Sequence, residues 1–496
     1  EMNKLNKICV AGGGTAGFVS ALILKTRFPH IDIEVVRSTD IGIVGVGEGS
    51  TEHWSEFMNY IGVSWRDVIL ECSATFKSGI MFRGWSDNDY LHSTSPDYDI
   101  SNGQYPYVYG HIMSSKQPCS NMNPKRTWDS KIPTWQATDP SADAPYNQYH
   151  FDTNKLNDFL VKVAINKGIT VIDDIIVDAV INDNGNITSL AGEKSSYTAD
   201  FFIDCTGFRK ILISKLGASW KSYDKYLKMK SAIMFPTESL DNYPLWTVAQ
   251  TMDYGWMFSI PVQTRTGNGY IFDSDYITAD QAKDEIDRFF NKDIEVARKI
   301  NFTPGCLDKV WINNCCAVGL SANFVEPLEA TSIGTSIQQI FLLMHRLPNY
   351  NQTTINDYNK DVNDIMTNIR DFVIMHYLTK KNNSNFWKDI QSMPIPDSLA
   401  EKLERWKYNL PIEDDFRGIT KYALFNQTHH IHVLNGLKLF DQTSIESEFN
   451  MMHPWIKNNA INVLAESMSY DEQTPLVTHS RFINYIKELY GVKKIA

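Results

Sequence analysis

Residues 7–17 read KICVAGGGTAG, and this stretch decides the fold. Lys7–Ala11 is a short apolar run typical of a buried strand, and a glycine-rich turn follows it directly. After the turn, the apolar segment Phe18–Thr26 predicts a helix, and Ile33–Val36 predicts a second strand. A strand, turn, helix and strand in this order indicate the opening of a doubly wound α/β domain.

The turn has the spacing GxGxxG, which allows a tight bend and the close approach of a pyrophosphate to a helix N-terminus. The residues expected to line this phosphate site are Gly12, Gly13, Gly14, Thr15, Ala16 and Gly17. The acid that usually holds the ribose after the second strand is replaced by Arg37. Arg37 suits the 2′-phosphate of NADP. Alternatively, the ribose of FAD is held by Ser38 or by backbone groups.

Two further glycine-rich segments favour FAD. One is GVGEGS at residues 45–50, and the other is DCTGF at residues 204–208, which ends an apolar strand. FAD lies extended across a domain and so needs several separated loops, whereas one turn is enough for a single phosphate group. We expect Gly45, Val46 and Glu48 to contact this cofactor.

Composition excludes several classes of partner. The 496 residues include 47 basic and 58 acidic side chains, a net charge of -11, which disfavours nucleic acids and anionic membrane surfaces. There is no run of 18 apolar residues, so no membrane-spanning helix is expected, and no secretory leader pattern is visible. The seven cysteines form no CxxC pair, which is typical of reduced thiols and predicts a cytoplasmic protein.

The stretch 87–149 is rich in Ser, Asn, Asp, Pro and Tyr and predicts a long ordered insertion or lid. A helix is expected at His150–Lys167 and several antiparallel strands within Lys228–Phe272. We divide the chain into a core at 2–340, which includes the insertion, and a mostly helical region at 341–496 packed on it. Further helices are expected at Gln281–Ile300, Thr335–Arg346, Ile355–Tyr377, Ser398–Trp406 and Ser480–Leu489.

The predicted fold class is therefore α/β, or α+β overall. It combines a Rossmann-like FAD-binding module, a β-sheet region on the substrate side and a mostly helical C-terminal region.

Five segments carry a resemblance to a known family. They are AGGGTAGF at 11–18, GVGEGS at 45–50, TFKSGIMF at 75–82, GWMFSIP at 255–261 and WINNCCAVGLSANFVEPLEATSI at 311–333. With these motifs the chain resembles the flavin-dependent halogenases of the tryptophan-halogenase type. The family signature WxWxIP has Phe258 in place of its second tryptophan.

The resemblance implies an enzyme that uses reduced FAD, supplied by a separate flavin reductase, together with oxygen and chloride, bromide or iodide. These would form hypohalous acid, which Lys77 relays to a small electron-rich aromatic substrate such as an indole or phenol. Glu329 would polarise the oxidant and take the ring proton. From its residues alone, Lys77 could equally be a surface lysine, and Glu329 an acid favoured near a helix N-terminus.

The resemblance also assigns supporting roles. The backbone N–H groups of Thr331 and Ser332 would hold the halide, although the family usually has Ser at position 330 and Gly at 332. Further flavin contacts are expected from Ile175 through its backbone and from Gly319, Leu320 and Ile333. Candidates for the substrate pocket are His92, Phe258 and His430.

The segment NQTHHIHVLNGLKL at 426–439 has two implications. It replaces the family's tryptophan-bearing segment, so free tryptophan is not the expected substrate. His430 and His432 would alternate on one face of a strand, and the sequence supplies no carboxylate or cysteine to complete a metal site. No metal is therefore expected.

Three other functions remain open at this point. A flavin-dependent aromatic hydroxylase would need neither Lys77 nor the WxWxIP motif. A flavin-binding redox sensor would tolerate the loss of Lys77 and Glu329, and an NADP-binding protein is suggested by Arg37 alone. The sequence also leaves a homo-oligomer open.

Overall fold

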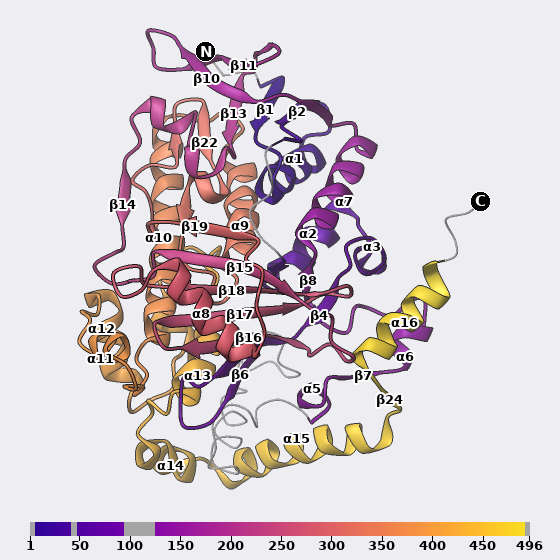
Figure 1. The fold of residues 1–496 in the computed structure, drawn as a ribbon, viewed down its shortest axis with the longest axis vertical. Helices are drawn as coiled ribbons and strands as arrows, with labels where there is room; N and C mark the ends of the chain where they lie inside the picture. Colours follow the sequence, from indigo (N-terminus) through magenta and orange to yellow (C-terminus); the bar gives the residue numbers. More distant parts are fainter. Residues whose placement is uncertain (1–4, 41–46, 94–124, 492–496) are drawn as a thin grey trace.

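The structure is a computed structural model that describes residues 5–40, 47–93 and 125–491 (Figure 1). The expected cofactor residues Gly45 and Val46 lie outside these ranges. Within them, no helix combines the length and apolar character needed to cross a membrane.

A six-stranded sheet carries the predicted N-terminal module. Its strand order is β21-β22-β13-β1-β2-β9, and all neighbours are parallel except β21 and β22. The strands are β1 (Lys7–Ala11), β2 (Asp32–Arg37), β9 (Thr170–Asp173), β13 (Phe201–Asp204), β21 (Trp311–Ile312) and β22 (Cys315–Ala317). Val10 pairs with Val35 on one side and Ile203 on the other, and all three are fully buried. The predicted α/β class is confirmed.

Helices flank this sheet and shape the site. Helix α1 (Thr15–Arg27) begins three residues before the predicted helix and packs against α7 (Thr153–Asn166) and α9 (Thr331–Arg346), as Figure 1 shows. Short elements complete the N-terminal half: α2 (His53–Ile61), α3 (Trp65–Glu71), α5 (Lys125–Trp128) and α6 (Trp135–Thr138). Helix α7 starts after the predicted position because residues 148–151 form a strand.

A seven-stranded sheet forms the second layer, in the order β19-β15-β18-β17-β16-β5-β6. Neighbouring strands are antiparallel except β16 and β5. The strands are β5 (Gly79–Arg83), β6 (Tyr90–Ser93), β15 (Ser231–Thr237), β16 (Trp246–Met252), β17 (Gly255–Pro261), β18 (Thr266–Phe272) and β19 (Arg298–Asn301). The antiparallel strands expected within Lys228–Phe272 are present.

Smaller sheets join the two layers. The most important contains β3 (Glu48–Gly49), β4 (Thr75–Lys77) and β8 (Gln148–Phe151). The chain leaves β4 at Ser78 and enters β5 in the larger sheet, so Lys77 lies where the two sheets meet. The other short strands are β10 (Ile176–Ile181), β11 (Ile187–Gly192), β12 (Ser196–Tyr197), β14 (Trp220–Ser222), β20 (Gly305–Leu307), β23 (Asn323–Phe324), and β7 (Lys131–Pro133) paired with β24 (Leu476–Thr478).

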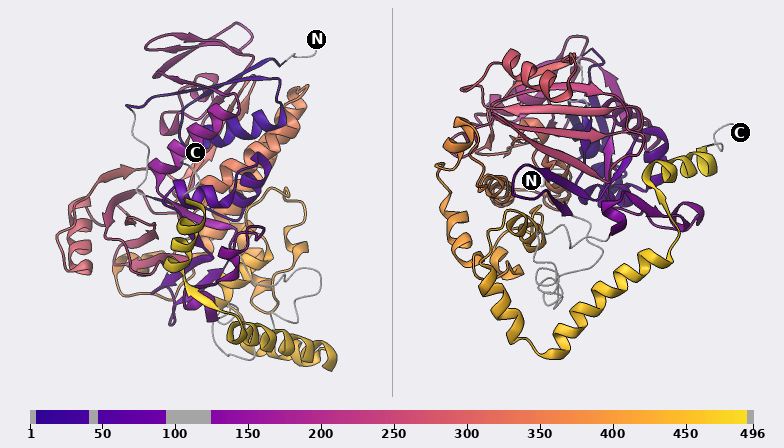
Figure 2. Two further views of the ribbon diagram at one scale, coloured as in Figure 1. Left: turned by 90° about the vertical axis from the view of Figure 1, so that its right-hand side faces the viewer. Right: turned by 60° about the horizontal axis from the view of Figure 1, so that its bottom comes forward.

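The C-terminal region is mostly helical, as predicted. Figure 2 shows α14 and α15 along one edge of the molecule, while α16 returns to pack against α3. The helices are α10 (Gln352–His376), α11 (Asn385–Ile390), α12 (Asp397–Trp406), α13 (Gln427–Gly436), α14 (Gln442–Met451), α15 (Pro454–Gln473) and α16 (His479–Tyr490). The division of the chain at residue 340 stays a prediction.

The long ordered insertion or lid expected over 87–149 stays a prediction, and its two ends form regular strands. Residues 90–93 form β6 at the edge of the large sheet, and residues 148–151 form β8. All residues of both strands are buried, so neither shows the alternation that marks a half-exposed strand. Residues 94–124 of the predicted lid lie outside the described ranges.

Two element predictions are wrong. The helix expected at Gln281–Ile300 is α8 (Ala279–Phe290), which ends at Asn291 in the left-handed conformation, and the strand β19 follows it. The strand expected around His430 and His432 is helix α13, whose N-cap Asn426 accepts from the Thr428 N–H. The polar-apolar alternation was misleading because nearly every side chain of α13 is buried.

Candidate active site

The first glycine turn has the geometry of a phosphate site. Gly12 has a φ of 109°, and a Cβ there would lie 2.0 Å from the Cys205 carbonyl oxygen. A Cβ on Gly17 would lie 2.0 Å from the Gly12 carbonyl oxygen, whereas Gly14 faces open space. Gly14 caps α1 without a side-chain hydrogen bond, and the first turn of α1 carries no acid. The free N–H groups there suit an anion.

Arg37 lies over this turn. A Cβ on Gly13 would be 2.2 Å from the Arg37 Cβ, so Gly13 is needed for the approach. The Arg37 Nη1 donates to Asn157 Oδ1 at 2.9 Å, and Asn157 Nδ2 donates to the Gly13 carbonyl at 2.7 Å. The guanidinium is thus fixed beside the expected phosphate and ribose site.

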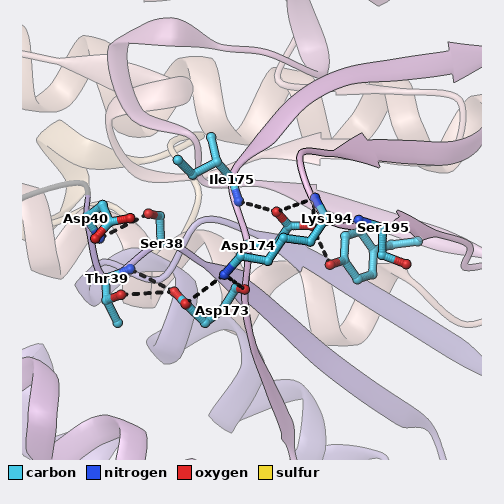
Figure 3. Close-up of polar contacts among 9 residues, drawn as sticks. Ser38, Thr39, Asp40, Asp173, Asp174, Ile175, Lys194 and Ser195 are labelled. Carbon is cyan, nitrogen blue, oxygen red and sulfur yellow. Dashed lines mark hydrogen bonds and ion pairs between the residues drawn. The ribbon is translucent and has the colours of Figure 1, made fainter.

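Ser38 and Ile175 lie at the ends of the neighbouring strands β2 and β9 (Figure 3). The Ser38 hydroxyl accepts from the Asp40 N–H at 3.1 Å and keeps its own proton for a ligand. The Ile175 N–H donates to Asp174, and its carbonyl accepts from Glu193. A backbone contact from Ile175 to the cofactor would therefore use the second lone pair of that carbonyl.

Glu48 tests whether the site fits a flavin. Its carboxyl is buried beside Thr15, and Oε2 has no hydrogen-bond partner among the residues that the structure describes. Burial raises the pKa of Glu48 to about 7, although a hydrogen bond from Thr15 lowers it. A buried carboxyl oxygen without a hydrogen bond is costly unless a ligand supplies one. The ribityl chain of FAD carries hydroxyl groups of the required kind, so the residues fit this cofactor.

A single largely apolar cavity connects Glu48 with the residues predicted for chemistry. Its lining includes residues predicted for the flavin, the halide, acid-base chemistry and the substrate pocket: Glu48, Leu320, Ile333, Thr331, Ser332, Glu329 and Phe258. The Phe258 ring fits into the lining of the cavity because residue 269 is glycine. A Cβ at position 269 would lie 2.3 Å from the ring. Gly319 directly precedes Leu320 and has a φ of 71°.

Lys77 lies beside this cavity with its side chain almost fully buried. Its Nζ donates to the Ser50 carbonyl at 2.7 Å. A Cβ on Gly49 would lie 3.4 Å from Lys77 Nζ and 3.6 Å from the Ala330 Cβ, so Gly49 lets the amine approach the start of α9. Burial lowers the pKa of Lys77 to about 8, although the charges of Glu329 and Glu52 raise it.

Glu329 is buried and held by two histidines. His92 Nδ1 lies 2.8 Å from Oε2, and His376 Nε2 lies 2.6 Å from Oε1. Burial alone would raise the pKa of Glu329, but His92 and His376 together, through electrostatic attraction and hydrogen bonds, hold it well below its usual range. Sequence reasoning assigned His92 to the substrate pocket and missed His376 altogether.

The backbone at Glu329 is unusual. Glu329 has a φ of 75° and Ala330 a φ of 53°, so two consecutive non-glycine residues are left-handed. Each such residue costs about 1–2 kcal/mol. The turn brings Glu329 to the N-terminus of α9, where Ala330 is the N-cap and supplies no side-chain hydrogen bond. The N–H groups at Thr331 and Ser332 therefore stay available to an anion such as a halide.

Glu326, three residues earlier, has a structural role. Its Oε1 accepts from Trp256 Nε1 at 3.1 Å and from the Tyr377 hydroxyl. Trp256 belongs to the GWMFSIP segment, so Glu326 links that segment to Tyr377 at the end of α10.

The histidines of α13 divide into two environments. His429 contacts His92 and Glu52, so carboxylates do lie near this group, contrary to the sequence-based reading. His430 instead packs among Phe372, Trp406 and other rings. Its predicted substrate role stays a prediction. Among the residues described here, no group of His, Cys, Asp and Glu is arranged to hold a metal.

Comparison with known proteins agrees with this site. The family model described as tryptophan halogenase matches residues 7–451. The tryptophan 6-halogenase SttH of Streptomyces toxytricini is 29% identical over 90% of this chain and 95% of its own. The 7-chloro-L-tryptophan 6-halogenase KtzR of Kutzneria sp. (strain 744) is 30% identical over 84% of this chain and 88% of its own.

Solved structures give the same result. The tryptophan halogenase of Shewanella frigidimarina NCIMB 400 superposes with a TM-score of 0.88 at 25% identity, over 98% of this chain and 99% of that one. BrvH, a flavin-dependent halogenase from Brevundimonas sp. BAL3, gives 0.83 at 25% identity, over 97% and 99%. The fold and site thus define a flavin-dependent oxidoreductase that halogenates a small aromatic substrate.

The chain belongs to the tryptophan halogenase family. The sequence analysis predicted this family, the halogenase activity and the use of FAD and halide. These predictions are confirmed.

Proposed function

We propose that Lys77 relays the halogenating agent to the aromatic substrate and that Glu329 takes the ring proton. When bound, reduced FAD would supply the electrons that activate oxygen, and the activated oxygen would oxidise halide to hypohalous acid. One observation carries the proposal: a buried amine and a buried, ionised carboxylate lie beside the same helix N-terminus, at the cavity that begins at Glu48. Buried charges of this kind are costly and are found mostly at functional sites.

Lys77 has the properties that a relay needs. Its Nζ is fixed by the Ser50 carbonyl, and burial brings its pKa to about 8, so charged and neutral forms coexist near neutral pH. The charged form donates a hydrogen bond to hypohalous acid, and the neutral form can accept the halogen to give a haloamine. Confinement matters because a free oxidant would react without selectivity.

Glu329 suits the second half of the reaction. Attack of the halogen makes the aromatic ring cationic, and a carboxylate nearby stabilises that positive charge. His92 and His376 keep Glu329 ionised. Removing a proton from a cationic ring needs only a weak base in the right place, which an acid with a lowered pKa can supply.

We propose that a separate flavin reductase supplies the reduced cofactor, because the sequence carries one GxGxxG turn and no second nucleotide fingerprint. NADPH alone should therefore not bleach the bound flavin. Rapid bleaching without an added reductase would refute this part of the proposal. The predicted cytoplasmic location and a homo-oligomer stay open.

Variants of both residues test the proposal, and the measurement is the mass of the reaction product. Lys77→Ala should abolish halogenation and leave FAD affinity within about twofold, because the amine is outside the cofactor turn. Glu329→Gln should slow halogenation less completely, because water can also take the ring proton. Lys402→Ala is the control: this lysine is partly buried over Trp406 in the helical region. Retention of a tenth of wild-type halogenation by Lys77→Ala would argue against the relay.

A further inference from the structure

Glu329 is one end of a continuous chain of hydrogen bonds that leads away from the cavity. His92 Nδ1 lies 2.8 Å from Glu329 Oε2, and His92 Nε2 lies 3.1 Å from His429 Nδ1. His429 Nε2 then lies 3.2 Å from Glu52 Oε1. The four side chains come from the turn before α9, from β6, from α13 and from the residue before α2.

The solvent exposure of the side chains increases along this chain from Glu329 to Glu52. The side chains of Glu329 and His92 are almost completely buried, and that of His429 is 5% exposed. The Glu52 side chain is 24% exposed. The chain therefore links a closed site to solvent by side-chain atoms alone.

The ring nitrogens can be satisfied along the whole chain. His376 faces the Phe372 carbonyl with Nδ1 and the Glu329 carboxylate with Nε2; both are acceptors, so His376 is an imidazolium while Glu329 is ionised. Once Glu329 is protonated, its O–H can donate to His92 Nδ1, the His92 Nε2–H to His429 Nδ1 and the His429 Nε2–H to Glu52, with both rings neutral. Burial lowers the pKa of His92, in keeping with a neutral ring.

We propose that His92 and His429 form a proton relay that carries the ring proton from Glu329 to Glu52 and so to solvent. This inference rests on the proposed role of Glu329 as the base. The C–H bond breaks, its electron pair restores the aromatic ring, and the proton joins Glu329. Glu329 passes it to His92 Nδ1, His92 releases its Nε2 proton to His429 Nδ1, and His429 releases its Nε2 proton to Glu52. One proton enters and one leaves, with no change in oxidation state.

The relay would return Glu329 to its ionised form after each turnover. After each turnover Glu329 carries a proton, and it must lose that proton before it can act again. Of the other ionisable groups near it, His376 already has both nitrogens directed at acceptors, and Lys77 is itself part of the reaction. His432 packs against His92 on the side of α13. His92 is the neighbour whose other nitrogen leads outward.

The first turnover separates the relay from the chemistry. The protein is loaded with reduced FAD, and a flavin reductase with NADH present in excess keeps the cofactor reduced for later turnovers. Bromide is used with whichever of indole, phenol and aniline the wild type brominates fastest. His429→Gln and Glu52→Gln should complete the first turnover at the wild-type rate, because Glu329 starts ionised. Later turnovers should be at least tenfold slower, which gives a burst of about one product per enzyme. Imidazole added to His429→Ala should remove the burst.

The controls keep the outcomes distinct. Val433→Ala changes a fully buried side chain of the same helix and leaves the four relay side chains in place, so it should show no burst. Glu52→Gln changes a partly exposed residue and should fold even if His429→Gln does not. Later turnovers at the wild-type rate, an equally slow first turnover or no rescue by imidazole would overturn the relay. A wild-type first turnover in Glu329→Gln would instead overturn the proposed base.

Discussion

Two helix N-termini are expected to bind anions, one at the cofactor turn and one at the halide turn, and the two turns are stabilised differently. Helices α1 and α9 both begin without a side-chain cap, so both offer free N–H groups to an anion. The turn before α1 uses Gly12 for its left-handed backbone. The turn before α9 uses Glu329 and Ala330, which are both left-handed and neither of which is glycine.

The difference lies in what stabilises each turn. Glycine adopts the left-handed conformation without a steric cost, so the first turn is specified by its own local sequence. The second turn costs about 1–2 kcal/mol for each residue, and distant residues offset that cost. His92 and His376 hold the Glu329 carboxylate from β6 and α10. The turn before α1 is therefore specified by its own sequence. The turn before α9 depends on contacts with residues far away in the chain.

The largest effect is expected from Gly12→Ala. The added Cβ would lie 2.0 Å from the Cys205 carbonyl oxygen, and neither backbone can move without distorting β1 or β13. FAD binding should be lost, and the apoprotein should lose about 3 kcal/mol of unfolding free energy. The measurements are denaturant unfolding and flavin titration.

Gly14→Ala is the matched control for this prediction. Gly14 has a φ of -76° and no atom near the added Cβ, so apoprotein stability should hold. Only FAD affinity should fall, because the Cβ would project toward the phosphates. Equal stability of the Gly12→Ala and wild-type apoproteins would show that this turn does not depend on glycine.

The next largest effect is expected from removing the charge of Lys77, which lies beside the turn before α9. Burial lowers the pKa of Lys77 from 10.5 to about 8. Between these values the unfolded chain binds more protons than the folded one, so wild-type stability rises as pH increases from 8 to 10.5. Below pH 8 the full cost of the buried charge is present. Lys77→Met should therefore raise the free energy of unfolding at pH 7 by about 1–3 kcal/mol.

Unfolding curves at pH 7 and pH 10 test this sign. The gain from Lys77→Met should shrink at the higher pH, while halogenation is lost at both. A variant that is less stable than wild type at pH 7 would mean that the Ser50 carbonyl and Glu329 compensate the buried charge fully.

The same contrast explains what could be predicted from sequence. Strand β1, the glycine turn and helix α1 were predicted because each depends on neighbouring residues. Lys77 and Glu329 entered through family resemblance, since their residue types alone also suit a surface. Burial at the junction of two sheets gives Lys77 its lowered pKa, and that junction is formed by segments far apart in the chain.

The misread segments have a common cause. Strand β6 is buried on both faces, and α13 is buried nearly all round, so neither shows the periodicity of a half-exposed element. Asn426 was an available signal for α13, because asparagine before a helix is a strong N-cap. No comparable signal linked His92, His376 and His429 to Glu329, because these contacts span sequence separations of 47 to 337 residues.

Ala330→Gly should sharpen the comparison with a smaller effect. It replaces a strained left-handed alanine by glycine and should stabilise the protein by about 0.5–1 kcal/mol, after allowing for the greater freedom of the unfolded chain. Ala322→Gly is the control at a negative φ of -100° and should destabilise by a similar amount. Denaturant unfolding measures both, and a destabilised Ala330→Gly would mean that this turn carries no strain.

The smallest effect expected is on halide choice. Ala330 stands where the family usually has serine, so the turn before α9 lacks one hydroxyl donor. Chloride is the most strongly hydrated of the three halides and gains most from an extra donor. Iodide is larger, less hydrated and easier to oxidise, although the Ser332 hydroxyl could replace part of the missing donor. We therefore expect bromide and iodide to be used at least as well as chloride.

Ala330→Ser should restore the missing donor and raise chlorination relative to bromination by a few-fold. Parallel reactions on one phenol with each halide measure this ratio, with Lys77→Ala as the background for oxidation outside the enzyme. Efficient chlorination by the wild type without enzyme-dependent iodination would contradict the expectation. An unchanged ratio in Ala330→Ser would mean that the backbone N–H groups of Thr331 and Ser332 alone set the preference. The anion site would then depend on the strained turn for its position and not on the side chain at 330.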